Sequence, residues 1–206
     1  MNDDVQYEMK RILATVLFLL CIAVPSTSNA RRLYYAEEFY LYVMNLYQVN
    51  PSLERNIRFM QWALKAPFDN PVRSLAKIET KTDFLRYQQL FKMHVNLLII
   101  DSYLQLARRF DKEHVYFFNI QYAEDLKKSF GIARYFYKIS FNYWDETLKY
   151  AKEAEKYTGR INIDAWEDEL YLIRTGDLDY RAIIESYLKK LESRMQIVQN
   201  YLDQSS

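Results

Sequence analysis

The stretch "FKMHVNLLIIDSYLQLARRF", residues 91–110, decides the fold class of this chain. Successive residues of an α-helix turn by about 100° around its axis, so the uninterrupted run Leu97–Ile100 places apolar side chains on every side. A helix that is apolar all round is buried by neighbours on several sides. We therefore expect a long central helix with further helices packed around it.

Turn-forming residues are too rare here for a fold that is rich in strands. The 206-residue chain contains three glycines and four prolines, and no proline follows Pro71. Strand-rich folds need many more turn residues. The sequence therefore predicts an all-α protein, with helices at roughly 31–49, 51–66, 82–109, 114–142, 143–157, 164–174 and 179–203.

Several helix ends are marked by residues with suitable backbone preferences. The pair Asn50-Pro51 is typical of an N-cap followed by proline at the first helical position. Gly159 in "YTGR" and Gly176 in "RTGD" stand where helices should end, because glycine tolerates the left-handed backbone that often follows a helix. The segment "APFDNP", residues 66–71, predicts a loop.

The predicted last helix carries an apolar seam. Its apolar residues alternate at spacings of four and three, which is the a/d pattern of a coiled coil. We expect this long C-terminal helix to lie on its neighbours, and a dimerising coiled coil, giving a homo-oligomer, is the alternative. The seam consists of Ile184, Leu188, Leu191, Met195, Val198 and Leu202.

The N-terminal segment has the order of a signal peptide. Lysine and arginine follow Met9, residues 12–24 carry no charge, and the polar "PSTSNA" comes next. Ser28 and Ala30 supply small residues at the −3 and −1 positions of a cleavage site. We expect residues 1–30 to be a signal peptide cleaved between Ala30 and Arg31, with translation starting at Met9.

Two other interpretations of this segment remain open. Residues 12–24 would make about 20 Å of helix, short of the roughly 30 Å hydrocarbon core, so an uncleaved membrane anchor is the less favoured reading. Lipidation of Cys21 is disfavoured because Leu20, rather than a small residue, precedes it. Cleavage would remove the only cysteine, and the mature chain would have no disulfide, thiol nucleophile or cysteine-based metal site.

Residues 31–203 have the composition of a single globular domain, followed by a short polar tail at 204–206. The formal net charge of the chain is +1, and half of its residues are hydrophobic. The positive charges are dispersed, so there is no basic block to follow a phosphate backbone. This pattern argues against a nucleic-acid partner.

The segment "NYWDETLKYAKEAEKY", residues 142–157, is similar to the second helix of a tetratricopeptide (TPR) repeat. Thr147, Ala151 and Ala154 keep the spacing at which that family places small residues, and Phe130-Gly131 resembles the Leu-Gly pair of its first helix. The separation between the two parts is about four residues longer than in the family.

Two further segments resemble the TPR pattern more loosely. One contains Tyr40, Val43, Tyr47, Met60 and Ala63, and the other contains Trp166 and Ala182. The resemblance implies a superhelical stack of antiparallel hairpins, in which small residues let helices approach closely. A helical bundle without repeats is the alternative fold.

Tyrosine is the most distinctive residue type, with 19 in the chain. A tyrosine ring combines an apolar body with a hydroxyl group, which suits helix interfaces and recognition surfaces alike. In TPR proteins the first helix of each hairpin lines a concave face, so the resemblance implies a groove for a peptide or a partner helix. Tyr34, Tyr42 and Tyr135 are the candidate partner-binding residues.

Motifs for catalysis and for metal or phosphate binding are absent from the sequence. His94 and His114 are isolated, and we expect His94 to be a core or interface residue, with Asp101 as a possible neighbour. The acidic run at Asp164, Glu167, Asp168 and Glu169 complements the dipole of a helix N-terminus without a metal. We therefore expect no enzyme activity, no cofactor and no metal.

These observations favour an exported interaction scaffold or assembly factor of the bacterial envelope, located in the periplasm or secreted, or anchored in the inner membrane if the N-terminal segment is uncleaved. The alternative is a periplasmic TPR protein that binds a small molecule for a transporter. In its general character, as a small, exported and tyrosine-rich protein, the chain also resembles the spirochaete periplasmic flagellar collar proteins. That resemblance implies a role in assembling a motor-associated scaffold.

Overall fold

The computed structural model describes residues 32–47, 52–112 and 120–203, and all regular structure in these ranges is helical. The expectations for the signal segment, including cleavage between Ala30 and Arg31, lie outside the described residues. The elements are α2 (Ala36–Tyr47), α3 (Leu53–Lys65), the short 3-10 helix η1 (Pro71–Arg73), α4 (Lys81–Asp111), α5 (Ile120–Ala154), α6 (Asp164–Thr175) and α7 (Tyr180–Asp203). The predicted all-α class is confirmed.

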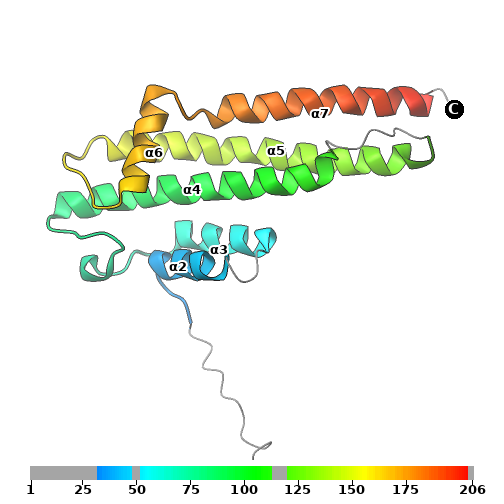
Figure 1. Cartoon of the computed structure of the whole chain (residues 1–206). Helices are drawn as coiled ribbons and strands as arrows, with labels where there is room; N and C mark the ends of the chain where they lie inside the picture. The colour runs from blue at the N-terminus through cyan, green and yellow to red at the C-terminus, as the bar shows by residue number, and fades with distance from the viewer. Residues whose placement is uncertain (1–31, 48–51, 113–119, 204–206) are drawn as a thin grey trace, which may run out of the picture. The chain divides into compact units, whose positions relative to one another are not determined.

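Helix α4 is the centre of the fold, as its sequence predicted. It lies between the hairpin formed by α2 and α3 and the long helix α5 (Figure 1). Phe91, Ile99 and Ile100 are fully buried, Leu97 is nearly so, and only Leu98 of the apolar run is partly exposed. Burial on all sides follows from contacts of α4 with α3, α5 and α6.

Helix α5 runs without a break where the sequence analysis expected two helices, 114–142 and 143–157. It continues from Ile120 to Ala154, so Gly131 and Thr147 stand on the same helix. The antiparallel hairpin expected between these positions is therefore not formed. A glycine within a helix is tolerated at a cost of about 1 kcal/mol, and the long apolar contact with α4 carries the helix through this position.

The other two expected hairpins have different outcomes. Helices α2 and α3 pack against each other side by side, and α3 also packs on α4. Helix α6, by contrast, runs at a steep angle to α7 and connects the end of α5 to the start of α7 (Figure 1). The described helices are therefore arranged as layers of a bundle around α4 and α5.

The seam of α7 packs within the chain. Ile184, Leu191 and Val198 are buried in a cluster that α4 and α5 also contribute to, and the intervening seam residues are partly buried against the same cluster. The expectation that this helix lies on its neighbours is confirmed. Any second copy of the chain would have to bind another face of α7.

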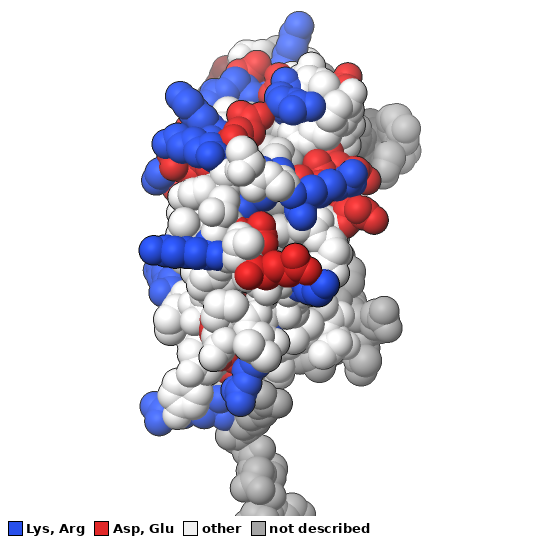
Figure 2. All heavy atoms as spheres, turned by 90° about the vertical axis from the view of Figure 1, so that its left-hand side faces the viewer, with Lys and Arg blue, Asp and Glu red and all other residues white. Residues whose placement is uncertain are grey.

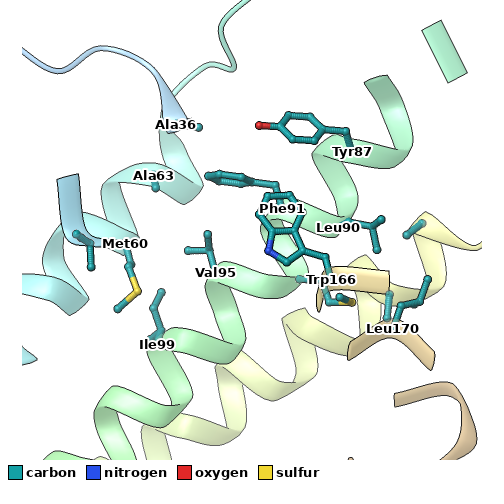
Figure 3. Packing of buried hydrophobic residues seen from close by; sticks show 14 of the residues in the cluster. Ala36, Met60, Ala63, Tyr87, Leu90, Phe91, Val95, Ile99, Trp166 and Leu170 are labelled. Carbon is teal, nitrogen blue, oxygen red and sulfur yellow. The ribbon is translucent and has the colours of Figure 1, made fainter. Parts of the chain in front are cut away.

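Trp166 of α6 is the meeting point of the second cluster. Figure 3 shows its indole beside Phe91 and Leu90 of α4, with Val95, Ile99 and Met60 continuing the core toward α3. The ring centroid of Trp166 lies 5.8 Å from that of Phe91 and 5.1 Å from that of His94. Trp166 thus packs α6 against α4.

Three helix ends differ in detail from the expectations. Ser52, rather than Asn50, is the N-cap of α3, and its hydroxyl accepts a hydrogen bond from the Arg55 amide. Gly176 ends α6 in the left-handed conformation with φ of 81°, as predicted. Helix α5 ends at Ala154, so Gly159 lies in the connection to α6 and not at the helix end.

The charged residues are interspersed on the face that Figure 2 shows, where lysine and arginine side chains alternate with aspartate and glutamate. This mixture agrees with the dispersed charges of the sequence. In the described residues, no helix combines the length and the apolar character that crossing a membrane requires.

Candidate functional site

The three tyrosines predicted to bind a partner, Tyr34, Tyr42 and Tyr135, all lie at the surface. Their exposed fractions are 58%, 37% and 61%. Tyr42 stands on α2 and stacks on Phe59 of α3, whereas Tyr135 stands on α5 and contacts its own neighbour Phe136. Tyr42 and Tyr135 therefore stand on different helices, and each lies at the edge of its own group of rings, since Phe136 also contacts Tyr103 and Phe110.

The group of rings around Tyr42, which we call the aromatic patch, consists of Phe39, Tyr42, Phe59 and Trp62. The ring centroids of Tyr42 and Phe59 lie 4.6 Å apart, and those of Phe59 and Trp62 lie 5.0 Å apart. Phe39 contacts both Phe59 and Trp62, at 6.2 and 5.9 Å. Trp62 keeps 44% of its surface exposed, so the patch presents large rings to its surroundings.

The spacing within each helix explains why the patch forms. Phe39 and Tyr42 are three residues apart on α2, and Phe59 and Trp62 are three residues apart on α3. Residues at this spacing share one side of a helix. Phe39 and Phe59 also pack against the core, and the α2–α3 hairpin brings the two aromatic pairs together. Trp62 was not among the predicted partner-binding residues, although the three-residue spacing of both aromatic pairs is visible in the sequence.

A pocket of about 350 Å³ opens between α2, α3 and α4. This volume lies at the lower end of the range for small-molecule sites. No residue of the aromatic patch lines it. The lining residues are Val43 and Met44 from α2, Asn56 and Met60 from α3, and Leu98, Asp101, Ser102 and Gln105 from α4.

Two polar residues of this pocket are unusually placed. Asn56 is only 2% exposed, and among the described residues its Nδ2 has no hydrogen-bond acceptor. Asp101 accepts a hydrogen bond from the hydroxyl of Tyr180 at the start of α7. Burial raises the pKa of the Asp101 carboxyl, and burial together with this hydrogen bond raises the pKa of the Tyr180 hydroxyl. The pocket thus combines an apolar wall with a buried amide and a partly desolvated carboxyl.

His94 is held by partners that the sequence analysis did not identify. Its Nδ1 lies 2.8 Å from Glu169 Oε2, and its Nε2 lies 3.2 Å from the hydroxyl of Tyr40. The ring stacks on Trp166 and is nearly buried. Both ring nitrogens are therefore engaged, and His94 joins α2, α4 and α6. Its predicted role as a core or interface histidine is confirmed, with Glu169 rather than Asp101 as the partner.

Of the four acidic residues at the start of α6, two contact other helices and two are exposed. Glu167 pairs with Arg86 and Glu169 with His94, so both connect α6 to α4. Asp164 and Asp168 remain exposed and lie within ion-pair distance of Arg160. The expected dipole role accounts for the position of the run but not for its two tertiary contacts.

No group of three or more histidine, cysteine, aspartate or glutamate residues in the described ranges is arranged to hold a metal ion. The other isolated histidine, His114, lies outside those ranges. Two smaller hollows lie elsewhere. One of about 250 Å³ is lined partly by Arg160 and Arg174, and one of about 170 Å³ lies between α3, α4 and α5.

Comparison with known proteins places the chain in one family. The model of DUF8513, a domain of unknown function, matches residues 82–201, and the chain belongs to this family. The match covers α4 to α7 and leaves α2 and α3 outside, so it includes the α4 wall of the pocket but no residue of the aromatic patch. Neither the curated proteins nor the solved structures include a match to the chain.

Proposed function

Taking the chain as a member of the DUF8513 family, we propose that it is an exported interaction scaffold or assembly factor of the bacterial envelope. Export is supported by the basic, apolar and polar regions of the first 30 residues in the sequence. The scaffold would bind a protein partner through the aromatic patch. A motor-associated complex is the example that the resemblance to flagellar collar proteins suggests.

The observation that carries this proposal is the exposure of Tyr42 and Trp62 within a preformed stack of rings. Tyrosine and tryptophan are enriched among the residues that dominate binding energy at protein interfaces. The stack also holds each ring in place before binding, which reduces the side-chain entropy lost on association. The patch lies on the α2–α3 hairpin, outside the part that matches the family model.

The test uses a photoreactive phenylalanine analogue at single positions in cells that produce the full chain. We expect positions 42 and 62 to cross-link to the same protein. Tyr122 of α5, with 54% of its surface exposed, is a matched control position, and it should not give that product. A third arm at Tyr135 examines the other predicted tyrosine.

Three outcomes would contradict the proposal. Cross-links from position 135 or 122 with none from 42 and 62 would move the partner site to α5. No specific product from any position, in cells where the protein is folded and exported, would remove the evidence for a protein partner. Detection of the unprocessed chain in the cytoplasm alone would contradict export.

A further inference from the structure

We propose that the pocket between α2, α3 and α4 binds a small organic amine that carries an apolar group and a carbonyl oxygen. This inference goes beyond the proposed scaffold role and does not depend on it, because the pocket and the aromatic patch share no residue. It rests on three features of the lining: its apolar wall, its carboxyl group and its buried amide.

The apolar wall of the pocket favours a ligand with an apolar group. Val43, Met44, Met60 and Leu98 line the pocket from three different helices. Methionine side chains are flexible and polarizable, so they adapt to ligands of irregular shape and contact aromatic rings favourably. A ligand with one phenyl or branched alkyl group matches this wall and the volume of the pocket.

Asp101 sets the charge of the ligand. Among the described residues it is the only titratable one in the lining, and it forms no ion pair with them within 4 Å. Its one hydrogen bond comes from the neutral Tyr180 hydroxyl. Burial disfavours its ionised form, while Arg108 and His94 favour that form without forming an ion pair with it, so an ammonium group in the pocket would add an opposite charge in direct contact. The carboxyl therefore selects a cation over a neutral or acidic ligand.

Asn56 indicates that the ligand carries a hydrogen-bond acceptor. A buried N–H group without a partner costs about 1–3 kcal/mol of desolvation, and a carbonyl oxygen of the ligand would accept its hydrogen bond. Since Asn56 stands on α3 and Asp101 on α4, the two polar groups approach the pocket from different helices. A ligand with both an ammonium and a carbonyl group would contact both walls.

The experiment titrates the full chain with L-phenylalaninamide, which has an ammonium group, a carbonyl and a phenyl ring. Binding is followed by NMR of the methionine methyl groups. Met44 and Met60 line the pocket, whereas Met195 packs on the other cluster and is an internal control. We expect shifts at Met44 and Met60 and none at Met195. Equal shifts at all three, or none at Met44 and Met60, would overturn the proposal.

Two analogues test the polar contacts on the unmodified protein. The compound 3-phenylpropanamide lacks the ammonium group, and 2-phenylethylamine lacks the carbonyl. Each should bind at least about tenfold more weakly than L-phenylalaninamide, since each loses one hydrogen bond to a buried or charged group. Equal binding of the neutral amide would overturn the role of Asp101, and equal binding of the simple amine would overturn that of Asn56.

Three variants connect each loss to a residue. Asp101→Asn should weaken binding of L-phenylalaninamide at least about tenfold and leave 3-phenylpropanamide unaffected. Asn56→Leu should weaken L-phenylalaninamide but not 2-phenylethylamine, without lowering the thermal midpoint. Tyr180→Phe keeps the carboxyl and should retain binding. Asn56→Leu and the analogue series decide the question even if Asp101→Asn folds poorly.

A final arm separates a free ligand from a partner protein. The tripeptide amide Phe-Ala-Ala offers the same ammonium, ring and carbonyl at the start of a peptide. We expect it to bind no more tightly than L-phenylalaninamide. Binding at least about tenfold tighter would place the natural ligand at the N-terminus of a protein and overturn the assignment to a free small molecule.

Discussion

Arg86 of α4 and Glu167 of α6 form a two-point ion pair in the interior of the fold. Arg86 Nε lies 3.1 Å from Glu167 Oε1, and Nη2 lies 2.6 Å from Oε2. Both side chains are less than a tenth exposed. The third nitrogen, Nη1, donates to the carbonyl oxygens of Ala154 and Tyr157 at 2.8 and 3.0 Å. One guanidinium group therefore joins α4, the end of α5 and the start of α6.

We expect Arg86→Met to lower the free energy of unfolding by about 3–5 kcal/mol, because it leaves a buried carboxylate and two helix-end carbonyls without their donor. Adding Glu167→Leu should restore part of this loss, since the unpaired charge disappears. Urea unfolding of both single variants and the double variant measures the coupling. Simple additivity of the two single effects would show that the pair does not act as a unit.

Gly131 offers a test of the continuous helix α5. Among the described residues no heavy atom from another part of the fold lies within 4 Å of where its Cβ would stand, and alanine costs less entropy than glycine in a helix. Gly131→Ala should therefore raise the free energy of unfolding by about 0.5–1 kcal/mol.

The matched control for this prediction is Gly176→Ala. Gly176 has a φ of 81°, which alanine rarely adopts, so this variant should be destabilised. A destabilising Gly131→Ala would contradict this prediction, because it would indicate that another helix lies close to Gly131, as in a TPR hairpin.

The aromatic patch and the core should respond differently to truncation. The double variant with Tyr42→Ala and Trp62→Ala removes rings that are partly exposed, so we expect a small change in the thermal midpoint. Trp166→Ala removes a buried hub and should cost about 3–5 kcal/mol. Thermal unfolding followed by circular dichroism compares the two. A patch variant that unfolds as easily as Trp166→Ala would show that these rings are part of the core.

Asp101 should make stability depend on pH. Burial raises the pKa of its carboxyl above the ordinary value of 3.8, and the nearby Glu169 acts in the same direction, while Tyr180, Arg108 and His94 oppose the shift. The folded state therefore holds this proton at pH values where the unfolded state has released it. It follows that the contribution of Asp101 to stability is highest below the ordinary pKa and falls as pH rises through the folded value.

Asp101→Asn cannot titrate, so its stability relative to the unmodified protein should increase between about pH 4 and pH 7. Urea unfolding across this range measures the difference. The exposed Asp125 of α5 provides the matched control, because Asp125→Asn changes the same charge at the surface. A constant difference for Asp101→Asn at all pH values would contradict the raised pKa.

Features that depend on local spacing could be predicted from the sequence. The scarcity of glycine and proline indicated helices, and the uninterrupted apolar run indicated that α4 is buried on most sides. The seam of α7 was likewise visible, because a helix repeats its faces at a known period. For the candidate site, Tyr42 was chosen from the TPR resemblance and stays a prediction, whereas Trp62 was not chosen, because its ring joins that of Phe59 and the α2 rings only once α2 and α3 lie side by side.

The sequence by itself determined the class of the fold and the buried face of its main helices, since both follow from interactions between residues close in the chain. Only the tertiary structure decided that α5 is continuous, that Arg86 pairs with Glu167, and that Asn56 and Asp101 share a pocket. Arg86 and Glu167 are 81 residues apart. No local pattern specifies such a pair, because its geometry exists only after α4, α5 and α6 have packed together.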